Sequence, residues 1–445
     1  MARKIYPGKT SFDELYSVLG FDDIKELEKK RARLFPQGNT DNEIAASSIF
    51  LASLSAIKEY REELFTEIGV KKITNQNVAV YTYTELQNPE THDRPDGLII
   101  ITSGKNSPII EWAGFVEAKV RNNPLKDEQI ERYAEYALAL GIKDIITISN
   151  HLVPNPHESP VKISKRSIHL FHWSWMYLKV FAYRLIRTNS VKDPDHIYML
   201  TELRRYFDSQ KNMNHYTYMG SKWKETVKKV HSADVSSKVD SITLHNLIES
   251  YAQEEKDISL RLTDDTDFHV ELFSKGNRYE QLEKMVCNSK TISSQFIINK
   301  SKDYTFTIDA DFIRQEIRCY TQIEIVKGKA KAQAQTTNLV KIFESSSGHT
   351  EDIMIEAFYT RNRSMKKAIP LSQLIDEKRK KLTYSFLDKS LGDTLTSFRV
   401  STNDHLGRDF QSGKIFIVKL EQIATRFLEQ VMANLVPKKP IKARN

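Results

Sequence analysis

Three ionisable side chains interrupt two otherwise apolar segments. Asp96 stands near the start of "RPDGLIII", residues 94–101, and Glu117 and Lys119 lie inside "FVEAKV", residues 115–120. A strand covered on both faces should be apolar throughout, because an unpaired charge placed there is unfavourable by several kcal/mol. We therefore expect these groups to be paired with one another or bound to a metal ion.

The spacing of these residues suggests a site for a hard dication. Side chains alternate between the two faces of a strand, so Glu117 and Lys119 share one face. A hairpin turn near residues 103–107 would bring Asp96 close to Glu117. Two carboxylates that repel each other suit Mg²⁺, with Mn²⁺ as a substitute, and the backbone carbonyl of Ala118 is a further candidate ligand. Such an ion polarises a phosphodiester oxygen and lowers the pKa of bound water, while Lys119 positions that water.

Two other interpretations of the same residues stay open. Asp96 could simply close the turn before its strand, as Pro-Asp-Gly sequences often do. Glu117 and Lys119 could form a structural ion pair on a strand face. The order of the surrounding elements favours a site, because a helix carrying Glu43 precedes the strands and a helix carrying Gln129 follows them.

The residues Pro95, Asp96, Glu117, Ala118 and Lys119 together resemble the motif of the PD-(D/E)XK nuclease superfamily. The resemblance implies an α/β, restriction-endonuclease-like mixed sheet flanked by helices, and metal-dependent cleavage of phosphodiester bonds in DNA. It covers roughly the stretch from residue 40 to residue 175, with a helical extension to about residue 230.

Two further features agree with this resemblance. Gln129 and Tyr133 are four residues apart, so they lie on one face of a helix, as in the glutamine-x-x-x-tyrosine element of the RecB-like branch. Glu43 opens the first helix, where many members carry an extra acidic residue that supports the metal. Glu117 departs from the aspartate that RecB-like members usually have, which leaves the subfamily open.

The length of 445 residues predicts more than one domain, since a single core rarely exceeds ~250 residues. We predict a helical lead-in over 1–39, the nuclease-like domain over 40–230, and an α+β accessory domain over 231–445. The lead-in should hold two short helices within 11–34. Short strands are predicted in the last part at 258–262, 268–273, 293–299, 304–309 and 318–326, with helices near 334–345, 371–382 and 416–435.

The composition is that of a soluble globular protein. There are 66 Lys and Arg residues against 58 Asp and Glu, a formal net charge of +8, which favours contact with a polyanion without establishing one. Cys287 and Cys319 are too few for a disulfide framework or a thiolate metal site. No apolar run approaches the ~20 residues of a membrane span, and no signal peptide is apparent, so we expect a cytoplasmic protein.

The sequence thus predicts a Mg²⁺-dependent endo- or exodeoxyribonuclease, in restriction, repair or antiphage defence. DNA is the expected partner and a membrane is not. A second copy of the chain is another candidate partner. So is a separate motor or sensor protein, because the chain has no Walker-type Gly-x-x-x-x-Gly-Lys-Ser/Thr loop for a nucleoside triphosphate. The alternative is a non-catalytic nucleic-acid-binding or scaffold protein that retains the nuclease fold.

Overall fold

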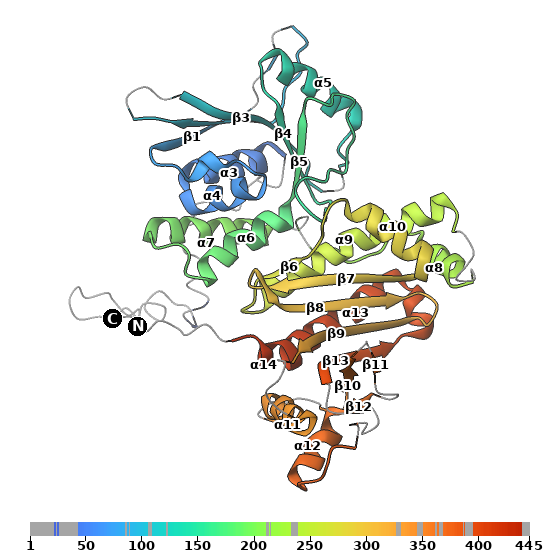
Figure 1. Ribbon diagram of the computed structural model, residues 1–445. Coiled ribbons are helices and arrows are strands. Elements are labelled where there is room, and N and C mark those ends of the chain that lie inside the picture. The colour runs from blue at the N-terminus through green and yellow to red at the C-terminus, as the bar shows by residue number, and fades with distance from the viewer. Residues whose placement is uncertain are drawn as a thin grey trace, which may run out of the picture.

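A computed structural model gives the architecture of most of the chain (Figure 1). It describes residues 22–23, 25, 43–84, 87–88, 90–105, 109–121, 123–210, 213, 215–232, 239–325, 331–344, 350–360, 363–364, 368–385, 387 and 395–437. The helices predicted within residues 11–34 fall almost entirely outside these ranges. The protein is a mixed α/β structure built on two sheets.

The first sheet has five strands in the order in which they occur along the chain. They are β1 (Val78–Thr84), β2 (Gly97–Ser103), β3 (Ile109–Ala118), β4 (Asp144–Ser149) and β5 (His169–Ser174). β1, β2 and β3 pair antiparallel, whereas β4 pairs parallel with both β3 and β5. The chain thus forms a three-stranded antiparallel meander and then passes through one helix to the parallel strand β4.

Helices cover both faces of this sheet, which explains why β3 is apolar for most of its length. The helices are α3 (Glu43–Ala56), α4 (Lys58–Glu67), α5 (Asp127–Ala139), α6 (Trp175–Arg187) and α7 (Pro194–Ser209). Phe115 packs in one core with Ile130 and Ala134 of α5. Val116 and Ala118 point to the opposite face and pack in a core with α3, α4 and α6. Glu117, on the Phe115 face, therefore sits inside a covered sheet.

The glycine after Asp96 allows α3 to pack directly over the start of β2. A Cβ atom at Gly97 would lie 2.5 Å from Cδ1 of Leu51, a buried residue of α3. Real Cβ atoms do not approach so closely, so a larger residue here would push α3 away from the sheet. Because α3 begins at Glu43, this contact also sets how near that carboxylate lies to the end of β3.

The second sheet has eight strands, with the path β11-β10-β13-β9-β8-β7-β6 and β12 beside β10. Every pairing in it is antiparallel. Its strands are β6 (Val270–Leu272), β7 (Thr291–Ile298), β8 (Ser301–Asp311), β9 (Glu316–Glu324), β10 (Met354–Tyr359), β11 (Arg363–Ser364), β12 (Ile369–Pro370) and β13 (Leu395–His405). Its helices are α8 (Trp223–Ser232), α9 (Ser241–Asp265), α10 (Arg278–Ser289), α11 (Ala332–Phe343), α12 (Leu371–Arg379), α13 (Gly413–Phe427) and α14 (Ala433–Leu435).

One predicted strand in this part is wrong. Residues 258–262 alternate between apolar and polar types, which is typical of a strand, but they lie inside the helix α9. Ile258, Ser259 and Leu260 are all buried in consecutive positions, because α9 is covered on several sides. Burial around a helix removes the periodic signal that would have identified it. The other four strands predicted there overlap β6, β7, β8 and β9, and the predicted helices overlap α11, α12 and α13.

The helix α9 joins the two sheet units. It packs beside α6, and its Leu260 belongs to the core under the first sheet, while most of its buried residues belong to the core under the second. Arg187 of α6 donates hydrogen bonds to the carbonyl oxygens of Thr263 and Asp264. Arg204 of α7 adds an ion pair at 2.6 Å to the Asp264 carboxylate.

Candidate active site

The two predicted acidic residues face each other across the β2–β3 pair. Gly97 pairs with Val116, so extending this antiparallel register by one position places Asp96 opposite Glu117. The Oδ2 atom of Asp96 accepts a 2.8 Å hydrogen bond from the backbone amide of Ala118. Asp96 therefore does more than close the turn before β2. Its carboxylate is hydrogen-bonded to β3, the strand that carries Glu117.

Lys119 lies between two carboxylates. Its Nζ atom is 2.5 Å from Oε1 of Glu117 and 2.8 Å from Oε1 of Glu43. The side chain of Glu117 is 1% exposed, whereas those of Lys119 and Glu43 keep 14% and 26% of their area in solvent. Glu43 thus joins the site from α3. The ammonium and the outer carboxylate stand on the side of the site that solvent reaches.

The helix α5 closes the site from the other side. Nε2 of Gln129 donates a 2.9 Å bond to Oε1 of Glu117 and a 3.0 Å bond to the hydroxyl of Tyr133. That hydroxyl in turn donates to the carbonyl oxygen of Arg94, at 3.1 Å, in the segment just before Asp96. The chain of bonds explains how two residues four apart on a helix support both acidic strands.

Electrostatics at the site follow from burial and crowding. Burial, and then repulsion by Asp96, raise the pKa of Glu117 to about 7, although Lys119 opposes both effects. Burial also raises the pKa of Asp96, although the bond from the Ala118 amide works against this. Burial alone would lower the pKa of Lys119, but Glu117 and then Glu43 hold it above its usual value. The ammonium stays charged, and the two acids compete for one proton or one cation.

The donor atoms fit a hard dication. Oε2 of Glu117 is buried and has no hydrogen-bond partner, while Oε1 of the same carboxylate already accepts from Lys119 and Gln129. A buried carboxylate oxygen without a partner is unfavourable unless something else binds it. Asp96 and Glu117 are therefore suitable ligands for Mg²⁺ or Mn²⁺. The carbonyl of Ala118 as a further ligand stays a prediction.

Two residues that the sequence did not single out support this site. Nε1 of Trp175, at the start of α6, donates a 2.8 Å bond to the carbonyl oxygen of Lys119. Trp175 is fully buried, as tryptophans in a core usually are, so its residue type gives no sign of this hydrogen bond. Nδ2 of Asn123 lies 3.4 Å from Oε2 of Glu43. Asn123 sits in an Asn-Asn-Pro sequence that is typical of an ordinary turn.

The two histidines of β5 differ in their surroundings. His169 and His172 point to opposite faces of β5: the first is exposed and the second is buried. Nδ1 of His172 lies 2.8 Å from the hydroxyl of Thr147, and its Nε2 lies 2.9 Å from the carbonyl oxygen of His151. Neither ring contacts Asp96 or Glu117 through any bond among the described residues.

Comparisons with protein-family models, with curated proteins and with solved structures found no match for this chain. Within the described ranges, no helix combines the length and the apolar character needed to cross a bilayer.

Proposed function

We propose that this chain is a Mg²⁺-dependent nuclease of the PD-(D/E)XK type that hydrolyses phosphodiester bonds in DNA. The observation that carries the proposal is the convergence of Asp96, Glu117 and Lys119 at the end of β3. Asp96 and Glu117 face each other from adjacent strands, and the Lys119 ammonium is 2.5 Å from the Glu117 carboxylate. The order of strands and helices around them supports a restriction-endonuclease-like fold.

In this proposal Asp96 and Glu117 hold the metal ion. When bound, the ion would polarise a phosphate oxygen and lower the pKa of a water molecule. The chain's own groups do the rest. Lys119 orients the attacking water and stabilises negative charge developing on the phosphate. Gln129 fixes the rotamer of Glu117, and Tyr133 holds Gln129 in place.

Glu43 has a separate part in this scheme. It accepts from Lys119 at 2.8 Å on the exposed side of the site, so it keeps the ammonium pointing at the two strands. DNA would approach from that side, because Glu43 and Lys119 keep part of their side chains in solvent, whereas Glu117 is buried. The biological setting we propose is restriction, repair or antiphage defence.

Plasmid nicking tests the proposal. The wild type should nick supercoiled DNA in the presence of Mg²⁺ and stop when EDTA is added, and Asp96→Ala and Lys119→Ala should be inactive while still folded. Lys72→Ala is the matched control, because Lys72 forms an exposed ion pair with Glu111 in the same sheet unit. Equal cleavage by all four proteins would identify a contaminating nuclease. The same assay with linear duplex, single-stranded DNA and RNA defines the substrate.

The rival is a non-catalytic nucleic-acid-binding or scaffold protein. One observation favours it: Oε1 of Glu117 is already satisfied by Lys119 and Gln129, as in a structural ion pair. The unpartnered Oε2 and the raised pKa of Glu117 argue against it, because a purely structural pair gains nothing from a second buried acid beside it. DNA binding that is retained without cleavage, and that is unaffected by Mg²⁺, would support the rival.

A further inference from the structure

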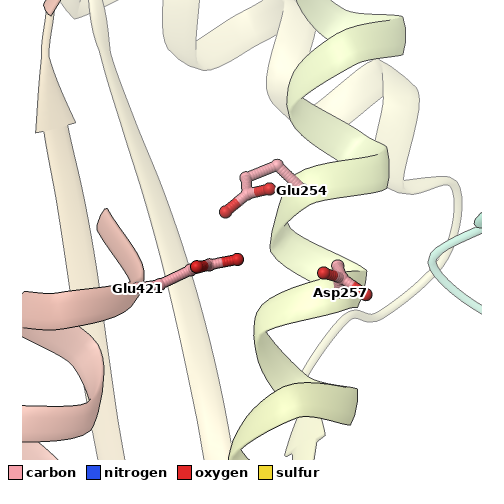
Figure 2. Close-up of side chains that lie close together, drawn as sticks. All are labelled: Glu254, Asp257 and Glu421. Atoms are coloured by element: carbon pink, nitrogen blue, oxygen red, sulfur yellow. The ribbon is translucent and has the colours of Figure 1, made fainter. Parts of the chain in front are cut away.

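A second group of acidic side chains lies in the other sheet unit, far along the chain from the candidate active site. Glu254 and Asp257 project from α9, and Glu421 projects toward them from α13 (Figure 2). One ligand atom from each of these residues lies within 4.8 Å of the others, and among the described residues no other such group of three or more occurs. An acidic group of this kind needs a further sign before it indicates a ligand.

That further sign is the burial of Glu254 without hydrogen-bond donors. Its side chain is 0% exposed, and neither Oε1 nor Oε2 has a hydrogen-bond partner among the described residues. Figure 2 shows its carboxylate turned toward Glu421. Buried carboxylates are normally satisfied, and this one lacks a donor on both oxygens.

The adjacent residue of α9 shows what a satisfied carboxylate looks like in this fold. Glu255 is also fully buried, but Arg278 donates to both of its oxygens, at 2.9 and 2.7 Å, and the hydroxyl of Ser294 donates a further bond at 2.8 Å. The fold therefore supplies donors to a buried acid on one side of α9. It supplies none to Glu254 on the other side.

The positive charges around the group do not balance it. Arg261 lies 2.8 Å from Oε1 of Glu421 and 3.7 Å from Oδ2 of Asp257, so one guanidinium serves two carboxylates. Asp257 is also held by Nδ1 of His215, at 2.8 Å, and by the backbone amide of Tyr216, at 3.1 Å. These bonds orient Asp257, as outer partners orient a metal ligand, but they bring no hydrogen-bond donor to Glu254.

We propose that Glu254, Asp257 and Glu421 bind a hard divalent cation, such as Ca²⁺, Mg²⁺ or Mn²⁺, that fastens α9 to α13. Carboxylate oxygens are the ligands that these ions prefer. Glu254 and Asp257 are three residues apart and share one face of α9, so both carboxylates can reach the same ion. The Glu421 side chain keeps 16% of its area exposed and gives the ion a route from solvent.

The expected role of this ion is structural. α13 packs on the second sheet, and α9 also contacts α6 under the first sheet. A cation held between α9 and α13 would stabilise the unit that carries the junction between the sheets. This site is separate from Asp96 and Glu117, so the inference does not depend on nuclease activity.

Mn²⁺ binding to the full chain tests the inference. After EDTA treatment and buffer exchange, bound Mn²⁺ is counted by electron paramagnetic resonance in the wild type and four variants. Glu254→Gln and Glu421→Gln should each bind one ion per chain fewer than the wild type. Glu429→Gln is the matched control, since Glu429 is exposed in the π-helical segment Leu428–Met432 that continues α13, and the variant should leave the count unchanged. Asp96→Asn should still bind the ion held by Glu254, whether or not it loses an ion at the Asp96 and Glu117 site.

Thermal unfolding supplies the second measurement. Ca²⁺ should raise the melting temperature of the wild type and of Glu429→Gln by a few degrees more than that of Glu254→Gln and Glu421→Gln, which keep only the proposed Asp96 site. Asp96→Asn should still show a rise, because it keeps the ion held by Glu254. Because Glu421 is partly exposed, its variant serves if Glu254→Gln does not fold. The inference is overturned if both glutamine variants bind as much Mn²⁺ as the wild type and respond equally to Ca²⁺. Glu254 would then carry a proton in place of a cation.

Discussion

The carboxylate of Asp96 is tied to the backbone of the neighbouring strand by a 2.8 Å hydrogen bond from the amide of Ala118. This bond fixes where the first acid stands relative to Glu117, the residue just before Ala118. It also offers a way to separate the charge of Asp96 from its place in the fold, because an asparagine side chain can accept the same bond.

Asp96→Asn should keep the fold and lose cleavage. The amide oxygen replaces Oδ2 as acceptor, so the melting temperature should stay within a few degrees of the wild type. The negative charge needed to hold the metal is gone, and we expect a loss of about 10²-fold or more in the nicking rate. Cleavage at the wild-type rate by this variant would remove Asp96 from the proposed metal site.

Lys119→Met should separate metal binding from cleavage. The variant removes the ammonium that lies 2.5 Å from Glu117 and 2.8 Å from Glu43, but leaves both proposed metal ligands in place. In EDTA it should be less stable than the wild type, because the buried Glu117 loses its counter-charge. Added Mg²⁺ should restore much of that stability but not the nicking activity. If Mg²⁺ restores cleavage as well, Lys119 has no part in the chemistry.

Gln129 and Tyr133 should differ in importance. Gln129→Leu removes the 2.9 Å bond to Glu117 directly, whereas Tyr133→Phe removes a hydroxyl that contacts only Gln129 and the Arg94 carbonyl. We expect a reduction in the nicking rate of about tenfold or more for Gln129→Leu and a smaller reduction for Tyr133→Phe. Measuring the rate at several Mg²⁺ concentrations should show that Gln129→Leu needs more metal. Equal rates for both variants and the wild type would make α5 a structural helix only.

Acid should destabilise the protein through His172. Burial, and then repulsion from His151, lower the pKa of His172 from 6.5 to about 3, so the folded state keeps this ring neutral. Above the pKa of the unfolded chain, about 6.5, the ring is neutral in both states and costs no stability. As the pH falls from about 6.5 toward 3, only the unfolded chain takes up the proton, so the folded state loses stability. Between pH 7 and pH 5 the ring should account for a loss of about 2 kcal/mol in the free energy of unfolding.

Urea unfolding at pH 7 and pH 5 checks this for the wild type and His172→Gln. The variant should lose less stability on acidification than the wild type, whatever its stability at pH 7. Burial lowers the pKa of His151 in both proteins, so its contribution is common to them except for the repulsion between the two rings. The same loss in both proteins would show that His172 does not titrate in this way.

The buried ion pair of α9 should be important for stability. Arg278→Met leaves Glu255 buried without its guanidinium partner, and breaking such a pair is unfavourable by about 3–5 kcal/mol. Arg314→Met is the matched control, because Arg314 is largely exposed and lies 3.9 Å from Asp311, where a surface pair contributes about 0–1 kcal/mol. The two free energies of unfolding should therefore differ clearly. If Arg278→Met resembles the control, the buried pair does not stabilise the fold.

Much of the first sheet unit followed from local pattern. Alternation along a strand predicted that Glu117 and Lys119 share one strand face, and helical spacing predicted that Gln129 and Tyr133 share one helix face. Both periods are properties of the backbone itself. The hairpin between β2 and β3 then brought Asp96 opposite Glu117. In the second unit the same reasoning failed at residues 258–262, where burial around α9 hides the helical period.

The sequence by itself determined the mixed α/β class and which residues gather around β2, β3 and α5, since these contacts arise between neighbouring elements. Only the tertiary structure decided that Glu43 of α3 pairs with Lys119, 76 positions further along the chain. The same holds for Glu421, which meets Glu254 and Asp257 from another helix. No periodicity links such distant segments. Their contact depends on how whole helices pack, and that packing depends on every core side chain at once.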